Sequence, residues 1–259
     1  MPQRLVIGNW KLHLDAAGAV ALAKAVAEGL QGREWDPSRV AVGLAPSHPF
    51  LVPVAGAIGG ADARVELVAQ ASYPEPEGAF TGAVSAPQLA SVGVRRVLVG
   101  HSERRRVFGV DDPQVTRAVH AVLTAGLSPV ACVGETLAER DAGRAREVVL
   151  GQLDAVLEGV KGKGALERLV VAYEPVWAIG TGQVATPAQA GEVHGWIKER
   201  LGSFSSHGAQ VPVLYGGSVK PGNIRELATT PGIDGALVGG ASLNPDSFLE
   251  IVQGVLDAS

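Results

Sequence analysis

The chain has 259 residues, of which 46% are hydrophobic and 19% are charged, and its formal net charge is −4 at pH 7. This composition supplies a large core and excludes global disorder, and the slightly acidic balance favours neither nucleic acid nor an anionic membrane as a partner. The length suits one α/β barrel, which needs about 250 residues, although two small domains would also fit it.

The N-terminus, the single cysteine and one basic run narrow the setting. The first residues hold too short an apolar stretch for a signal peptide or a membrane span, so we expect a cytoplasmic protein. Cys132 lies in an apolar run, which predicts a buried, inert thiol that has no partner for an intrachain disulfide. We interpret the run Arg104, Arg105 and Arg106 as a solvated helix face rather than an anion site.

Apolar runs rich in β-branched residues recur along the chain. They are mostly continuous rather than alternating, which is typical of strands that are buried on both faces of a parallel sheet. In chain order, eight such runs begin at Arg4, Val40, Val65, Val97, Ser128, Leu169, Val211 and Gly235.

Segments with helical periodicity lie between these runs. Residues 16–30 carry an apolar stripe, and Asp112 with Pro113 begins another helix with an acidic N-cap and proline at its first position, which stops at Gly126. Residues 142–157 and 187–201 follow the same pattern. Eight β-then-α units without a linker predict one (β/α)8 barrel domain over residues 1–259, with a doubly wound open sheet as the alternative.

Chemically active side chains directly follow several of these runs. Asn9 and Lys11 follow the first run, His101 and Glu103 the fourth, and Glu174 the sixth. Catalytic groups of such barrels gather at the carboxyl ends of the strands. We therefore expect these residues, which lie far apart in the sequence, to share one mouth of the barrel.

Glu174 stands between an apolar run and Pro175, and Val176, Trp177 and Ile179 come next. Apolar surroundings predict a desolvated carboxylate with a raised affinity for protons, which suits a general base. A surface carboxylate at a strand exit is the alternative.

His101 and Lys11 each have a functional and a structural interpretation. If a helix begins after His101, its positive end disfavours the imidazolium and keeps the ring neutral; the alternative is an ordinary structural histidine. Lys11 could serve an anion or a carbonyl oxygen, or be a surface lysine.

Glycine-rich turns follow the last strands. Residues 216–218 come after the seventh run, Gly239 and Gly240 come after the eighth, and Gly180 lies in the segment after Glu174. Their backbone N–H groups could approach a phosphate closely, as they do after strands seven and eight of many barrels; ordinary tight turns are the alternative.

Other ligand motifs fail. Residues 180–185 match the dinucleotide pattern G-x-G-x-x-A, but no acidic residue ends a strand about twenty residues later, so we reject it. There is no Walker loop, and the six histidines lack metal-site spacing, so we expect no metal.

Five segments together resemble those of triosephosphate isomerases: GNWK (8–11), VGHSERR (99–105), AYEPVWAIGTG (172–182), YGGSV (215–219) and LVGGASL (237–243). They occur in the family's order and cover essentially the whole chain. The resemblance implies a TIM barrel that interconverts dihydroxyacetone phosphate and D-glyceraldehyde 3-phosphate through an enediol(ate), in glycolysis and gluconeogenesis, without a cofactor.

The resemblance also implies roles for the candidate residues. Glu174 matches the catalytic base, His101 the electrophile, and Glu103 an acid behind them. The positions that match the family's substrate contacts are Asn9, Lys11, Gly180, Ser218, Gly239 and Gly240. The segment after Glu174 matches a lid that expels water from the site.

The family is usually a homodimer in which the third loop, here with Phe80 and Thr81 at its tip, enters the partner. Ala71, Ala83 and Val110 stand where the family usually has Asn, Glu and Glu, so they bear on the dimer contact rather than on the chemistry. Two rival functions are a synthase acting on a larger sugar phosphate and a non-catalytic barrel used as a scaffold. Short loops count against the first, and the presence of Glu174, His101 and Lys11 counts against the second.

Overall fold

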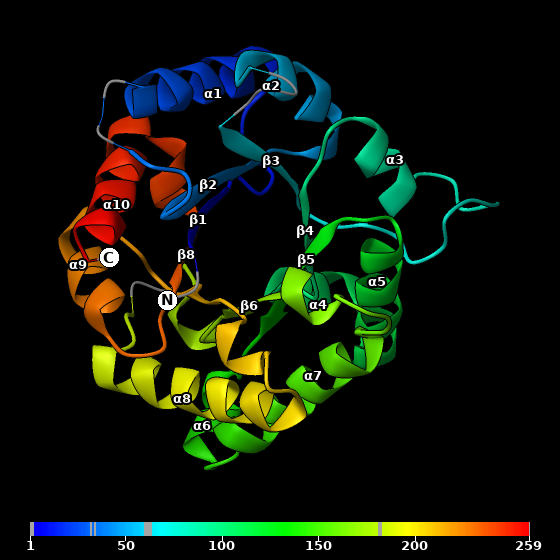
Figure 1. The fold of residues 1–259 in the computed structure, drawn as a ribbon, viewed down its shortest axis with the longest axis vertical. Helices are drawn as coiled ribbons and strands as arrows, with labels where there is room; N and C mark the ends of the chain where they lie inside the picture. Colours follow the sequence, from blue (N-terminus) through cyan, green and yellow to red (C-terminus); the bar gives the residue numbers. More distant parts are fainter. Residues whose placement is uncertain (1–2, 32, 34, 60–63, 181–182, 259) are drawn as a thin grey trace.

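The computed structural model describes residues 3–31, 33, 35–59, 64–180 and 183–258. In this part of the chain, eight parallel strands close into a barrel, in which each strand pairs with the next and β8 pairs with β1 (Figure 1). The helices surround the strands (Figure 1). The (β/α)8 barrel predicted from the sequence is confirmed, and the open sheet was the wrong alternative.

The strands and helices alternate along the chain, with short 3-10 helices near some of the strand ends. The strands are β1 (Arg4–Asn9), β2 (Val40–Ala45), β3 (Val65–Ala69), β4 (Arg96–Val99), β5 (Ser128–Val133), β6 (Val170–Tyr173), β7 (Val213–Tyr215) and β8 (Gly235–Val238). The α-helices are α1 (Ala16–Gln31), α2 (Leu51–Ala57), α3 (Ala86–Ser91), α4 (Ser102–Phe108), α5 (Asp112–Thr124), α6 (Leu137–Asp141), α7 (Ala145–Gly159), α8 (Pro187–Phe204), α9 (Pro221–Thr229) and α10 (Pro245–Asp257). The 3-10 helices are η1 (His48–Phe50), η3 (Leu166–Arg168), η4 (Val176–Ala178), η5 (Gly208–Gln210) and η6 (Gly240–Leu243).

The barrel interior is a packed core of its own. Alternate strand residues point inward, because successive side chains of a strand lie on opposite faces. Twelve buried residues form this inner cluster: Leu5, Ile7, Ala41, Ala45, Val68, Leu98, Val130, Cys132, Val170, Ala172, Leu214 and Leu237. The residues between them face the helices, which explains why the strands read as continuous apolar runs. The buried state predicted for Cys132 is confirmed.

Two predicted helix boundaries were wrong. The N-cap of α5 is Asp111, whose side chain accepts a hydrogen bond from the Gln114 amide, so the helix begins one residue earlier than we expected. The helix expected over residues 142–157 is instead α7, preceded by the short α6, and Gly143 with φ of 72° separates the two. A left-handed glycine ends a helix, and here it allows the chain to turn before α7 starts.

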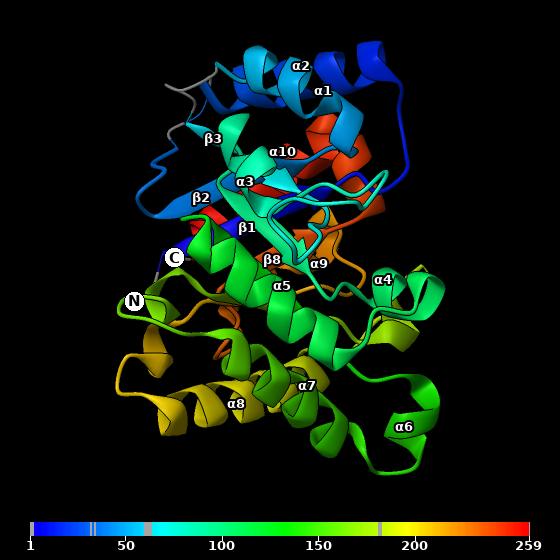
Figure 2. The same cartoon turned by 90° about the vertical axis from the view of Figure 1, so that its right-hand side faces the viewer.

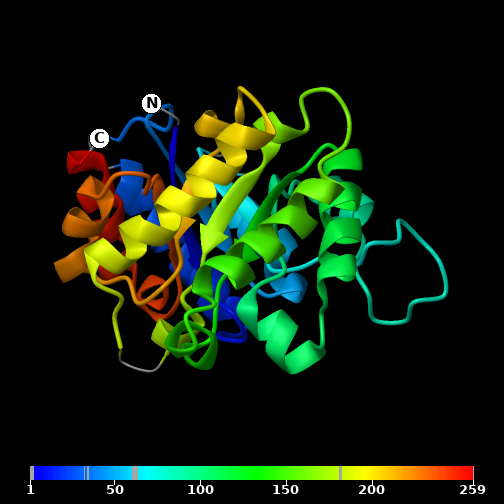
Figure 3. The ribbon, with the colours of Figure 1, turned by 90° about the horizontal axis from the view of Figure 1, so that it is seen from below.

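The segment between β3 and α3 leaves the body of the barrel. It forms the cyan loop at the right of Figure 1 and Figure 3. Its base is closed by the Tyr73 amide, which donates to the carbonyl oxygen of Val84 at 2.7 Å. On the same side of the barrel, α5, α7 and α8 lie next to one another (Figure 2).

Candidate active site

The carboxyl ends of the strands surround a cavity of about 250 Å3. Of the nine residues that the sequence singled out, the cavity is lined by all except Glu103: Asn9, Lys11, His101, Glu174, Gly180, Ser218, Gly239 and Gly240. They come from β1 and from the segments after β1, β4, β6, β7 and β8. The expected gathering of these residues at one mouth of the barrel is therefore present.

Glu174 follows β6 and faces His101, which follows β4. The Oε1 atom of Glu174 lies 2.9 Å from His101 Nε2, and both side chains are buried. The backbone amide of Ser102 donates to Oε2 of Glu174 at 2.9 Å. A carboxylate with both oxygens engaged is fixed in direction, and here it borders the cavity.

The direction of the Glu174 pKa corrects the expectation from the sequence. Burial raises this pKa, but the charge of His101, the hydrogen bonds from His101 and from the Ser102 amide, and Lys11 lower it. The net pKa lies below its ordinary value. Apolar neighbours in the sequence showed the burial but not the donors, which come from other strands.

His101 caps α4 with its ring. Its Nδ1 accepts the Glu103 amide hydrogen at 3.2 Å, and its Nε2 lies 3.3 Å from Asn9 Nδ2. An acceptor Nδ1 needs a lone pair, so this contact places the ring proton on Nε2. Burial lowers the pKa of His101, but the Glu174 carboxylate raises it more, so the pKa lies above its ordinary value, opposite to the direction expected from the helix end alone.

Lys11 is held by its backbone and by its side chain. Its backbone has φ of 51°, an uncommon conformation for a lysine. The Lys11 amide donates to Asn9 Oδ1 at 3.1 Å, and the Lys11 carbonyl accepts from Ser47 and Gln70. Its ammonium lies 2.6 Å from Glu103 Oε1. Glu103 is thus a partner of Lys11 that lies outside the cavity lining.

The glycines after β7 are required by close packing. A Cβ at Gly217 would lie 2.2 Å from the Tyr215 hydroxyl oxygen, and one at Gly216 would lie 2.9 Å from Cγ of Glu174. Gly239 differs, because a Cβ there would meet only the Lys11 side chain, at 3.7 Å. Gly180 has φ of 68°. Gly180, Gly239 and Gly240 line the cavity, and backbone donors at these positions suit an anion.

Sequence reasoning missed Glu135, which is fully buried beside the segment after Glu174. Its Oε1 accepts from the Tyr173 hydroxyl at 3.1 Å, from the Trp177 indole at 2.9 Å and from Arg140 at 3.0 Å. The available signal was an acid two residues after an apolar run. Thr181 and Gly182, which the sequence places in the lid, lie outside the described residues.

The expectation of a solvated arginine run was wrong for Arg105. Its Nε donates to the Gly100 carbonyl at 2.9 Å, and its Nη1 lies 2.5 Å from Asp112, with only 18% of the side chain exposed. Arg104 instead stacks over the Phe108 ring at 4.3 Å. A basic run in the sequence does not distinguish these outcomes, because each depends on which side of the helix the arginine lies.

Within the described ranges, no group of three or more His, Cys, Asp or Glu residues could hold a metal ion. No helix there has both the length and the apolar character needed to cross a membrane.

The fold and the site define a class of protein. They form a (β/α)8 enzyme in which a buried carboxylate, an imidazole and an ammonium surround a cavity with glycine amides, an arrangement suited to proton transfer on a small anionic carbonyl compound. The family model for triosephosphate isomerase matches residues 4–255. The chain therefore belongs to the triosephosphate isomerase family, and the enzyme class expected from the sequence, an intramolecular isomerase, is confirmed.

Curated relatives give the same result. The chain is 47% identical over 255 residues to the triosephosphate isomerase of Alkalilimnicola ehrlichii, and 46% identical over 255 residues to that of Syntrophotalea carbinolica, with 98% of each chain covered in both comparisons. It is 45% identical over 251 residues to that of Rhodopirellula baltica, with 96% of each chain covered.

Proposed function

We propose that this chain interconverts dihydroxyacetone phosphate and D-glyceraldehyde 3-phosphate, with Glu174 as the base. The reaction is that of the family. The observation that carries the residue assignment is the buried Glu174 carboxylate, 2.9 Å from His101 Nε2, at the edge of a cavity that Lys11 and the glycine turns complete.

This geometry suits removal of a proton from the carbon next to the substrate carbonyl. The substrate carbonyl lies between His101 Nε2 and the Lys11 ammonium, and Glu174 takes the proton from the carbon next to it. The proton returns to the neighbouring carbon, and the hydroxyl proton of that carbon passes to the former carbonyl oxygen, so no redox partner is required. A positioned base contributes about 10²–10⁴-fold and one oxyanion donor about 10²–10³-fold.

Substrate binding also changes the base. A carbonyl oxygen that takes the Nε2 hydrogen of His101 removes one of the donors that lower the Glu174 pKa. The pKa of Glu174 rises when this hydrogen bond is lost, so the carboxylate becomes a stronger base. The carboxylate that faces His101 also raises the pKa of that ring, so the exchange of partners favours the neutral imidazole.

We assign the phosphate group of the substrate to the glycine-rich side of the cavity. Gly180, Gly239 and Gly240 offer backbone amides, and Ser218 joins them, although its hydroxyl donates to the Ala178 carbonyl at 2.8 Å in this arrangement. A segment that closes over an enediolate phosphate excludes water and suppresses loss of the phosphate. Residues 176–179 supply the apolar part of that cover.

One assay separates the three functions. A coupled isomerase assay with D-glyceraldehyde 3-phosphate gives rapid turnover if the proposal is correct. A synthase for a larger sugar phosphate or a non-catalytic scaffold gives none. Lack of turnover in a correctly folded sample would overturn the proposal.

Two observations support a homodimer as the working form. Leu12 next to Lys11 is 96% exposed, and Phe108 is 65% exposed, so a single copy leaves large apolar side chains in water. Ala71 and Val110, two of the departures from the family pattern, line a cavity of about 250 Å3 together with Phe108, beside the base of the protruding loop. The second copy would insert its loop there, with Phe80 near the tip.

Equilibrium sedimentation tests this association, and a fully active monomer would contradict it. We further propose that the enzyme is cytoplasmic and has no nucleic-acid partner, in keeping with its net charge of −4.

A further inference from the structure

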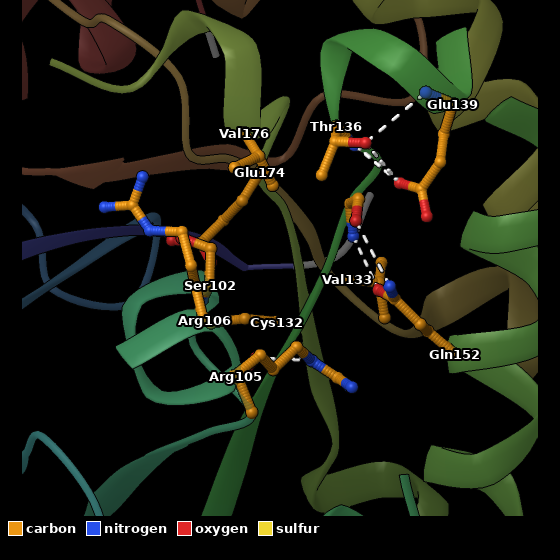
Figure 4. A pocket seen from close by; sticks show the side chains of 12 residues that line it. Ser102, Arg105, Arg106, Cys132, Val133, Thr136, Glu139, Gln152, Glu174 and Val176 are labelled. Atoms are coloured by element: carbon orange, nitrogen blue, oxygen red, sulfur yellow. Dashed lines mark hydrogen bonds between the residues drawn. The ribbon is translucent and has the colours of Figure 1, made fainter. Parts of the chain in front are cut away.

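Glu174 borders a second cavity, and among the described residues it is the one that lines both this cavity and the first. This cavity has a volume of about 320 Å3, and its lining includes Ser102, Arg105, Cys132, Gly134 and Gln152 (Figure 4). A side chain that faces a cavity lacks packing atoms on that side. The position of the Glu174 carboxylate therefore depends on its polar contacts and on its backbone.

The segment after β5 fixes that backbone. The Glu174 amide donates to the Val133 carbonyl at 2.8 Å. Gly134 approaches even closer: a Cβ at this position would lie 1.8 Å from the Glu174 carbonyl oxygen and 3.3 Å from its Cα. No side chain fits between the two residues, so a displacement of Gly134 is passed directly to Glu174.

Gly134 is in turn held by one side chain from α7. The Gly134 amide donates to Gln152 Oε1 at 2.8 Å, and Gln152 Nε2 donates to the Gly134 carbonyl at 3.2 Å. In Figure 4 both contacts are drawn as dashed lines from the Gln152 side chain to the backbone next to Val133. A side-chain amide that engages both backbone groups of one residue fixes its orientation as well as its distance.

We propose that Gln152 is a positioning residue for the catalytic base, acting through the Gly134 backbone. The inference rests on the proposed role of Glu174. The proposed phosphate contacts of Ser218, Gly239 and Gly240, which follow β7 and β8, have no part in this connection. Loss of the two hydrogen bonds should therefore lower turnover and leave phosphate binding unchanged.

The main test is Gln152→Met, which keeps the length of the side chain and removes both hydrogen bonds. Because a displacement of about 1 Å can cost about 10²-fold in rate, we expect kcat to fall by roughly 10- to 100-fold. KM for the triose phosphate and Kd for inorganic phosphate should stay close to those of the unsubstituted enzyme. A folded variant with unchanged kcat, or with kcat and phosphate affinity lost in parallel, would overturn the proposal.

Asp154→Ala is the matched control on the same helix. Asp154 pairs with Arg200 of α8 at 2.7 Å, so its removal loosens α7 without touching Gly134. We expect nearly unchanged kcat in this variant. If it lowers kcat as much as Gln152→Met does, a general loosening of α7 explains the effect and the proposal fails.

Gln152→Glu supplies a signature that a merely structural role would not give, and it decides the question if the methionine variant does not fold. The ionised carboxylate can accept from the Gly134 amide but cannot donate to its carbonyl, whereas the protonated acid can do both. We expect the kcat of this variant, relative to the unsubstituted enzyme, to rise as the pH falls toward about 5. A ratio that does not change with pH would count against the proposal.

Glu174→Asp separates this proposal from the assignment of the base. Asp at position 174 already withdraws the carboxylate, so adding Gln152→Met should cost less than it does in the unsubstituted enzyme. Full additivity would show that Gln152 acts elsewhere. An unaffected Glu174→Gln enzyme would instead refute the base itself, whatever the result at position 152.

Discussion

Two buried titratable side chains, Glu174 and His194, have opposite surroundings. Glu174 borders two cavities and has the hydrogen-bond donors of His101 and the Ser102 amide, together with the charge of Lys11, around it. His194 of α8 packs edge-on against the Tyr173 ring, with 5.8 Å between the ring centroids, and its Nδ1 donates to the Gly232 carbonyl at 2.9 Å. Burial, with a smaller contribution from the charge of Lys198, lowers the pKa of His194 to about 4, against the partial opposition of Gly232 and Asp234.

The contrast shows what makes a buried ionisable group functional. At Glu174 the charged form is stabilised by groups that a substrate can displace, next to space that a substrate can fill. At His194 the neutral form is stabilised by packing, and no cavity adjoins the ring among those described above. Desolvation is common to both sites, so the donors and the open space make the difference.

The largest effect is expected at Glu174. Glu174→Gln keeps the shape and removes the base, so turnover should fall by about 10²–10⁴-fold while inorganic phosphate still binds. His194→Gln, at the other buried site, should leave turnover close to normal, because His194 contacts neither cavity of Glu174. Coupled-assay rates and phosphate titrations of both variants measure these effects. Near-normal turnover of Glu174→Gln would show that the two buried sites do not differ in function.

The second effect concerns stability and is expected at His194. An unfolded histidine binds a proton below a pH of about 6.5, whereas the folded one resists protonation until about 4, so the unfolded state holds more protons between these values. The contribution of His194 to stability is therefore complete above this range and declines by about 3 kcal/mol as the pH falls to 4.

Urea unfolding of the original chain and of His194→Gln from pH 7 to pH 4, at equal protein concentration, measures this contribution. The free energy of unfolding of the variant should fall by about 3 kcal/mol less over this range. Parallel pH profiles would show that His194 is not held neutral by the fold.

The two sites also differ in how far the sequence predicts them. Eight apolar runs and the residues directly after them predict the barrel and place Glu174, His101 and Lys11 at one mouth. The sequence did not predict the direction of the Glu174 pKa, because the groups that lower it are His101 and Ser102, after β4, and the charge of Lys11, after β1. It also did not predict the hydrogen bonds of Glu135, Gln152 or Arg105, because their partners are brought close only when the chain folds.

The third effect concerns the phosphate side of the mouth. Gly239→Asp adds a carboxylate where a Cβ has room beside Lys11, so the fold should tolerate the change. The new charge repels a phosphate and competes for the Lys11 ammonium. Because a charge-assisted hydrogen bond contributes about 1.5–3 kcal/mol, we expect inorganic phosphate to bind roughly 10- to 100-fold more weakly. Calorimetric titration measures this, and unchanged affinity would place the phosphate elsewhere.

The smallest effect is expected where a charge pair lies in water. Arg146 and Glu199 approach to 3.2 Å between α7 and α8, with 57% and 71% of their side chains exposed. Solvent screens such a pair and both side chains lose freedom in forming it, so Arg146→Ala should change the free energy of unfolding by no more than about 1 kcal/mol and leave kcat unaltered. Urea unfolding and the coupled assay check both statements. A large loss of stability or of kcat would mean that charge pairs matter in this protein regardless of their exposure. That result would contradict the comparison of Glu174 with His194, in which the surroundings of the charge decide its effect.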